Sequence, residues 1–268
     1  MGANLAPTWI GSMLRLNVQF PNTSRSLPPQ PVLPGPQHKH VMSWFVVQDE
    51  HGSLHEEYIE PLIGHLRFPL HKCIHPVPVT PQYQFLYSKL KGWILPPSLP
   101  ISEYVVYFDA GATTWNDMSS TSLEWFATMW ARSGIVFDDV HAYNENATPP
   151  DTTIPRDWAD KVVFHTVDMA EVETHFVPDM IQATTSVNDY VLFKLDTTSP
   201  LLESSYLRAI LDHENACTID ELVWDHRIGG HYTEYEWVDM VPDTDLQTAY
   251  DTLYKLRANK GVRAHSWI

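Results

Sequence analysis

Several apolar runs of this sequence end in an acidic residue, and the type and place of these acids point to a ligand site. In the clearest run, residues 104–109, apolar side chains lead to Asp109 and are followed at once by Ala110 and Gly111. Buried parallel strands have such continuous apolar runs, and ligands of open α/β sheets bind beyond the carboxyl ends of these strands. Gly111 would allow a tight turn and a close approach of the backbone to a ligand. The alternative interpretation is an ordinary strand-to-helix connection, in which Asp and Gly are common.

Polar residues follow four later apolar runs in the same way. Because the carboxyl ends of parallel strands lie along one edge of a sheet, these residues are expected to share a site with Asp109. A carboxylate after the second strand suits a ribose, since it accepts hydrogen bonds from two hydroxyls. The residues are Asn144 and Glu145 after the second strand, Asp168 after the third, Asp196 after the fourth, and Asp225 with His226 after the fifth.

The turn after the first strand is poor in glycine, and this restricts the kind of cofactor. Residues 109–115, DAGATTW, lack the G-x-G-x-x-G pattern, so a pyrophosphate cradle is not expected. A cofactor with a ribose and no phosphate fits better, and S-adenosylmethionine is the common one. Its amino-acid end would lie near Gly111, its ribose near Asn144 and Glu145, and its adenine near Asp168.

The elements that position these residues alternate along the chain. Short apolar runs typical of strands are separated by segments with apolar residues at helical spacing. This alternation predicts a mainly parallel α/β sheet covered by helices on both faces. Strands are predicted at residues 44–47, 104–109, 135–137 with 140–143, 162–168, 190–196, 221–224 and 262–268, helices at 123–130, 201–211 and 246–258, and a loop with a helical turn at 56–67.

The composition favours a folded protein without a polyanionic partner. Of the 268 residues, 44% are hydrophobic and 19% charged, as in a globular domain. The formal net charge of −16 disfavours nucleic acid and anionic membranes, since both attract clustered Lys and Arg. No apolar run approaches the length of a membrane span, and Cys73 and Cys217 are expected to be reduced thiols. We therefore expect a cytoplasmic protein without membrane insertion.

Prolines divide the chain into an arm and one domain. Six prolines lie between positions 21 and 36, so residues 1–40 are predicted to form an extended arm that could contact a protein partner. Residues 41–268 are predicted to form a single α/β domain. Within it, residues 41–103 would be an entry layer or lid, and residues 104–268 the core.

Several segments, taken in order, resemble one enzyme family over roughly residues 41–268. The chain is similar to class I S-adenosylmethionine-dependent methyltransferases, and among them to FkbM-like proteins of algae, fungi and large algal viruses. This resemblance implies a Rossmann-like, mainly parallel seven-stranded sheet and O-methylation of a carbohydrate or another small hydroxylated acceptor. The matching segments are residues 59–67, 108–112, 134–138 with 142–143, 191–196 with Pro200 and Glu203, 220–226 and 261–267.

The sequence departs from the pattern of these relatives at three places. Asn144 stands where they usually carry an acid, and the acidic Glu145 comes one residue later. A shift of one residue along a strand moves a side chain to the opposite face. Residues 195–200 read LDTTSP where relatives often read L-D-I-D-T-P, so one acid is missing, and residues 225–227 read DHR in place of E-H-H.

Methyl transfer to a hydroxyl requires a base near the end of the sheet strands. His226 is the first candidate, because imidazole titrates near neutral pH, and Asp196 or Asp225 could orient it. His226 could equally be a structural histidine. The same three residues could hold a divalent ion, since carboxylates and imidazole are competent ligands. Trp115 could stack on adenine or a sugar, although tryptophans are more often core residues, as expected for Trp125, Trp130 and Trp224.

Two other functions stay open at this point. The departures from the family pattern and the proline-rich arm would also suit a methyltransferase-like protein without catalysis, serving as a structural or assembly subunit. A nicotinamide-dependent oxidoreductase is less favoured, because the phosphate-binding loop of such enzymes is missing.

Overall fold

The structure is a computed structural model, and it describes residues 8–10, 43–48, 53–60, 94–97, 104–112, 115, 123–144, 154–167, 177–197, 199–212, 219–225 and 246–267. The chain divides into two compact units. One comprises Ser98–His226 and Val262–Ala264, and the other comprises Met1–Pro97, Arg227–Gly261 and His265–Ile268. None of the described helices is long and apolar enough to cross a membrane.

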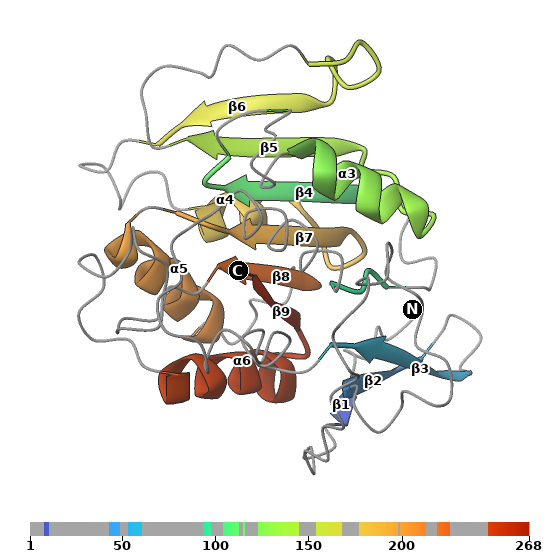
Figure 1. Cartoon of the computed structure of the whole chain (residues 1–268), viewed down its shortest axis with the longest axis vertical. Coiled ribbons are helices and arrows are strands. Elements are labelled where there is room, and N and C mark those ends of the chain that lie inside the picture. Colours follow the sequence, from blue (N-terminus) through green and yellow to red (C-terminus); the bar gives the residue numbers. More distant parts are fainter. Residues whose placement is uncertain are drawn as a thin grey trace, which may run out of the picture. The chain divides into compact units, whose positions relative to one another are not determined.

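A six-stranded sheet forms the main layer, in the order β6-β5-β4-β7-β8-β9 (Figure 1). The pairs β6–β5, β5–β4, β4–β7 and β7–β8 are all parallel, which confirms the predicted mainly parallel α/β fold. The central strands β4 and β7 are buried along their whole length, as their continuous apolar runs predict. The strands are β4 (Val105–Ala110), β5 (Asp139–Asn144), β6 (Val162–Thr166), β7 (Tyr190–Leu195), β8 (Glu221–Asp225) and β9 (Arg263–Trp267).

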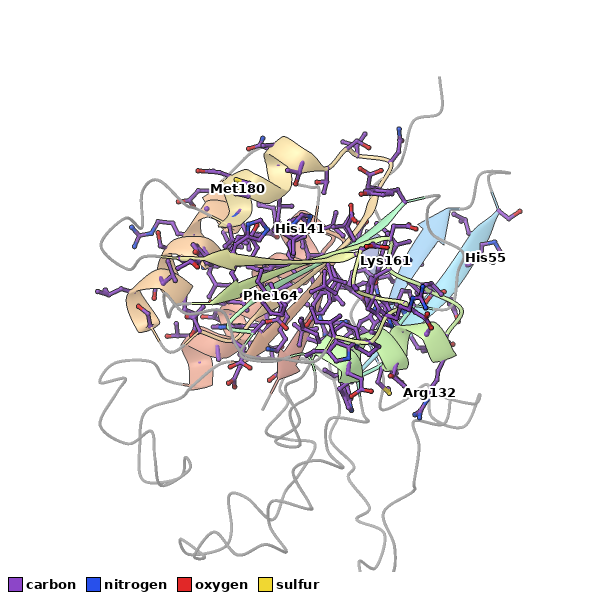
Figure 2. The ribbon with its side chains drawn as sticks, turned by 90° about the horizontal axis from the view of Figure 1, so that it is seen from above. His55, Arg132, His141, Lys161, Phe164 and Met180 are labelled. Atoms are coloured by element: carbon purple, nitrogen blue, oxygen red, sulfur yellow. The ribbon has the colours of Figure 1, made fainter. Side chains whose placement is uncertain are left out.

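Helices cover the two faces of this sheet, and the alternation of side chains assigns each helix to a face. Tyr107 of β4 meets Phe126 of α3 (Leu123–Arg132), with ring centroids 5.4 Å apart. Phe193 of β7, which belongs to the opposite face, meets Tyr206 of α5 (Pro200–Asp212) at 6.4 Å. A further helix, α4 (Val177–Thr184), contacts α5. Figure 2 shows the same alternation on the outer strands, where His141 and Phe164 lie on opposite faces.

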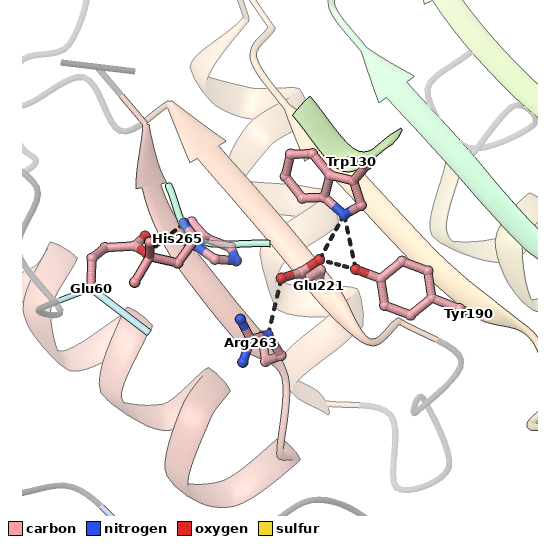
Figure 3. A network of polar contacts seen from close by, with 7 residues as sticks. Glu60, Trp130, Tyr190, Glu221, Arg263 and His265 are labelled. Carbon is pink, nitrogen blue, oxygen red and sulfur yellow. Dashed lines mark hydrogen bonds and ion pairs between the residues drawn. The ribbon is translucent and has the colours of Figure 1, made fainter. Parts of the chain in front are cut away.

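A buried carboxylate joins three strands to α3 (Figure 3). Glu221 of β8 is fully buried, and its Oε2 accepts hydrogen bonds from Trp130 Nε1 at 3.1 Å and from the hydroxyl of Tyr190. Its Oε1 lies 3.0 Å from Nε of Arg263 on β9. Because a buried charge must be paired and hydrogen-bonded, this set of contacts fixes these elements relative to one another.

Two aspartates, one just before β5 and one just before β8, make the same kind of contact. Each side chain accepts a hydrogen bond from a backbone N of the neighbouring central strand. Asp138 precedes β5, and its Oδ2 accepts from Val105 N at 2.9 Å. Asp220 precedes β8, and its Oδ2 accepts from Val191 N at 2.8 Å. Burial raises the pKa of Asp220 to about 7, against the weaker opposing effect of the Val191 N–H.

The raised pKa of Asp220 makes stability depend on pH. The folded protein holds this proton up to about pH 7, whereas the unfolded chain releases it near the ordinary value of 3.8. The free energy of unfolding should therefore fall as pH rises from about 4 to 7, by at most about 1.4 kcal/mol per pH unit. Asp220→Asn keeps an acceptor for Val191 N and removes the titration. Urea unfolding of both proteins at several pH values should show the variant gaining relative stability toward pH 7, and parallel pH profiles would contradict this.

The other unit contains a small antiparallel sheet and a helix. Strands β1 (Thr8–Ile10), β2 (Ser43–Gln48) and β3 (Leu54–Ile59) pair in the order β1-β2-β3. The helix α6 (Leu246–Lys260) buries Ala249, Leu253 and Leu256, whose spacing is that of one helix face, as predicted.

A second buried carboxylate joins distant segments within this unit. Oε1 of Glu60 lies 2.6 Å from Nδ1 of His265, and Arg257 Nη1 donates to the carbonyl of Glu60 at 3.0 Å. All three residues are fully buried. These contacts connect the segment after β3 with α6 and the middle of β9.

Some sequence predictions of elements were wrong. Residues 56–59 form part of β3 and not a loop, because β3 pairs with β2 along its whole length. Residues 135–137 are not a strand, so β5 begins only at Asp139. Helix α4 was not predicted. Six strands are described in the main sheet, so the seventh stays a prediction, as do the arm and the lid.

Candidate functional site

The candidate site lies at the carboxyl ends of β4 and β7. Between these two parallel strands, the order in which successive strands are added to the sheet reverses. Beyond β4 lie β5 and then β6, whereas β7 is followed on the other side by β8 and β9. Crevices that bind ligands in open α/β sheets form at such a switch point. The register pairs Asp109 with Lys194 and Ala110 with Leu195, so Asp109 and Asp196 end two adjacent strands.

A buried chain of polar contacts runs across these two strand ends. Lys194 Nζ lies 3.1 Å from Asp109 Oδ1 and 3.1 Å from Asp196 Oδ2. The hydroxyl of Tyr107 donates to Asp109 Oδ2 at 2.5 Å. The side chains of Asp109 and Lys194 are fully buried, whereas 10% of the Asp196 side chain is exposed. Asp196 is therefore the member of this charge cluster (Tyr107, Asp109, Lys194 and Asp196) that reaches the surface.

The charge cluster keeps its lysine protonated and its tyrosine neutral. Burial alone lowers the pKa of Lys194, but the adjacent carboxylates of Asp109 and Asp196 together raise it above its ordinary value. Burial, and next the charge of Asp109, raises the pKa of Tyr107 well above its ordinary value. Burial also raises the pKa of Asp109, and the charge of Lys194 and the hydrogen bond from Tyr107 oppose this rise. Lys194 thus lies as a cation between two carboxyl groups, and Tyr107 acts as a hydrogen-bond donor.

Gly111 is required by the close approach of β7 to the end of β4. Its φ is +118°, and a Cβ at this position would lie 1.7 Å from the carbonyl oxygen of Asp196. The backbone N of Asp196 donates to Ala110 O at 2.8 Å, and Gly111 N donates to Tyr143 O at 3.1 Å. The sequence predicted that Gly111 makes room for a ligand, but the space on its Cβ side is filled by the backbone of Asp196.

The structure brings together part of the predicted site. Asp109, Gly111 and Asp196 lie side by side, and the buried Asp225 ends β8, the next strand. The backbone of Asn144 ends β5 and pairs with Thr166. Three predicted residues lie outside the described residues, namely Glu145, Asp168 and His226.

Lys194 and Tyr107 were not predicted as site residues, although the sequence holds a signal for the lysine. Lys194 stands inside the apolar run 190–196, YVLFKLD. A lysine in a fully buried strand must be paired, so an acidic partner on the neighbouring strand could have been predicted. Tyr107 gave no comparable signal, because tyrosines are common in buried strands.

Trp115, in the turn after β4, is a core residue. It is 2% exposed, and its ring centroid lies 5.2 Å from that of Trp158. Its carbonyl accepts from Glu124 N at the start of α3. Its indole Nε1 has no hydrogen-bond partner in the part of the chain that the structure describes. Trp130 and Trp224 are also buried, as expected. The same expectation for Trp125 was wrong, because its side chain is only half-buried.

Among the described residues, no group of three or more His, Cys, Asp and Glu side chains could hold a metal ion. The predicted set of Asp196, Asp225 and His226 includes one residue outside the described part, so a divalent ion at these residues stays a prediction.

Comparison with family models, with curated proteins and with solved structures finds no match for this chain.

Proposed function

We propose that this protein binds S-adenosylmethionine and transfers its methyl group to a hydroxyl of a carbohydrate or another small acceptor. The observation that carries the proposal is the switch point between β4 and β7, where Asp109, Gly111 and Asp196 end two adjacent strands. We further propose a Rossmann-like, FkbM-like fold with a seven-stranded sheet.

The charge of the strand ends supports this choice of cofactor. Asp109 and Asp196 contribute two formal negative charges, and Lys194 contributes one positive charge. This net negative charge, which reaches the surface at Asp196, suits a cation. S-adenosylmethionine carries a sulfonium and an ammonium group but no phosphate. A pyrophosphate would be repelled, since the lysine is already held by two carboxylates. The unpaired indole N–H of Trp115, within the described residues, would gain an acceptor if the bound group reached the turn.

The bound cofactor supplies an electrophilic methyl group on sulfur, and the protein must align the acceptor and remove its proton. In this proposal His226 takes the proton from the acceptor hydroxyl, and Asp196 or Asp225 orients the imidazole. The turn at Gly111 and the residues Asn144, Glu145 and Asp168 would hold the rest of the cofactor. Alignment itself can account for several kcal/mol of the barrier.

Titration calorimetry with the full chain tests the proposal. We expect saturable binding of S-adenosylmethionine below millimolar concentration, and no change in a spectroscopic titration with reduced nicotinamide cofactor. Asp196→Asn should weaken binding about tenfold, or about 1.4 kcal/mol. Asp138→Asn is the matched control, because Asp138 lies at the amino ends of β4 and β5, away from the carboxyl ends that form the site. This variant should bind S-adenosylmethionine as the wild type does. Absence of binding at millimolar cofactor would refute the proposal.

One observation favours the alternative of a methyltransferase-like subunit without catalysis. Both oxygens of Asp109 are engaged by Lys194 and Tyr107, and the Cβ side of Gly111 is filled by Asp196. These contacts would be explained by a purely structural role. That alternative requires assembly with a partner, for which residues 1–40 are the proposed contact. It fails if deletion of these residues leaves assembly intact while Asp109→Ala abolishes a measured methyl transfer.

A further inference from the structure

We infer that Lys194 is a positioning residue, which holds Asp196 in one orientation at the carboxyl edge and makes the site select a positively charged cofactor. The inference rests on the proposed function, because the charge in question is that of the sulfonium.

Asp196 is fixed by contacts from two strands. Its backbone N donates to Ala110 O at 2.8 Å, and its carbonyl packs against Gly111 so closely that no Cβ would fit. Its side-chain Oδ2 lies 3.1 Å from Lys194 Nζ. Backbone and side chain are therefore both held, so the carboxylate needs no reorganisation when a ligand arrives.

Lys194 is itself immobile, which is what a positioning residue requires. Its side chain is fully buried, and its Nζ lies 5.9 Å from the centroid of the Phe126 ring. On the other side Nζ lies 3.1 Å from Asp109 Oδ1, and Asp109 is held in turn by the Tyr107 hydroxyl. Through these contacts, buried residues of the core hold the partly exposed carboxylate of Asp196 in place.

A fixed Asp196 should make the site prefer a positively charged cofactor. The carboxylates of Asp109 and Asp196 and the ammonium of Lys194 sum to one formal negative charge, at a place where water is largely excluded. Electrostatic interactions are stronger there than in bulk water. S-adenosylmethionine and S-adenosylhomocysteine differ by one positive charge and a methyl group at sulfur. A fixed Asp196 should favour the charged form, and a freely rotating one should favour it less.

A simpler explanation is that Lys194 only neutralises Asp109. The two explanations differ in the paired variant Asp109→Asn with Lys194→Met, which removes both buried charges at once. Replacing a buried ion pair by uncharged groups is often neutral for stability, whereas removal of one partner is costly. If Lys194 only neutralises Asp109, the paired variant should have both the stability and the cofactor selection of the wild type. If Lys194 positions Asp196, the paired variant should have wild-type stability but altered cofactor selection.

The experiment measures urea unfolding and the affinities for S-adenosylmethionine and S-adenosylhomocysteine in the full chain. We expect the paired variant to unfold near the wild-type midpoint, but its affinity ratio to shift about tenfold toward S-adenosylhomocysteine. Asp196→Asn should give the same shift, and adding it to the paired variant should change the ratio little further. Lys161→Met is the control, since Lys161 Nζ donates to Phe137 O and makes no described contact with a member of the charge cluster, and its ratio should be unchanged.

The outcomes separate the two proposals. A wild-type ratio in the stable paired variant overturns the role of Lys194 and leaves the proposed function standing. A wild-type protein that binds neither compound overturns the proposed function, and the inference falls with it. If the paired variant does not fold, Asp196→Asn alone decides, because a wild-type ratio in that variant also overturns the inference.

Discussion

Replacement of Gly111 by alanine is expected to unfold most of the protein or to leave it severely destabilised. The new Cβ would lie 1.7 Å from the carbonyl oxygen and 2.5 Å from the carbonyl carbon of Asp196. These are backbone atoms of a buried strand end, so they cannot move aside as a flexible side chain could. The φ of +118° adds strain for any residue with a Cβ. Strain and overpacking each cost about 1–3 kcal/mol, so we expect a loss of about 2–6 kcal/mol in the free energy of unfolding.

Gly134→Ala is the matched control for this prediction. Gly134 also has a positive φ, of +86°, but a Cβ there would meet nothing within 4 Å. Its replacement should therefore cost only the backbone strain, about 1–3 kcal/mol. Urea unfolding of both variants separates the close approach from the strain. Equal losses in the two variants would show that β4 and β7 are not packed as closely at Gly111 as described.

The contrast between these glycines separates what a sequence pattern predicts from what depends on the sheet order. The strand that ends at Asp109 was predictable, because a continuous apolar run is typical of a central parallel strand. The need for a glycine at position 111 was also predictable. Its reason was not, because the atoms that fill the space come from Asp196, more than eighty residues later. Sequence patterns report local conformation, whereas a close approach between strands depends on the sheet order.

The same limit explains what was missed elsewhere. Residues 54–59 include the adjacent Glu56 and Glu57, so they did not resemble a strand, yet they pair with β2 and form β3. Glu57 is buried there, which a local pattern cannot predict. Lys194 required knowledge of which strand lies beside β7. Asp196 and Asp109 were found because acids at strand ends recur along the chain and need no knowledge of sheet order.

The second large effect is expected from Glu221→Leu. The carboxylate of Glu221 is fully buried, lies 3.0 Å from Arg263 Nε and accepts from Trp130 Nε1 and the Tyr190 hydroxyl. Leucine would remove the carboxylate that neutralises a cation with only 6% of its surface exposed. Breaking a buried pair by removing one partner costs about 3–5 kcal/mol. Urea unfolding should therefore show a midpoint far below that of the wild type.

The double variant Glu221→Leu with Arg263→Leu distinguishes the loss of charge balance from a general disturbance of packing. It removes the arginine as well, and the indole of Trp130 keeps a partner, because its Nε1 lies 3.1 Å from the Tyr190 hydroxyl. Most of the lost stability should then return, since uncharged groups often replace a buried ion pair without cost. A double variant as unstable as Glu221→Leu would mean that the carboxylate stabilises the fold through its hydrogen bonds to Trp130 and Tyr190 more than through Arg263. Stability would then depend on the hydrogen bonds that Glu221 accepts from β7 and α3, and the ion pair between Glu221 and Arg263 would contribute little.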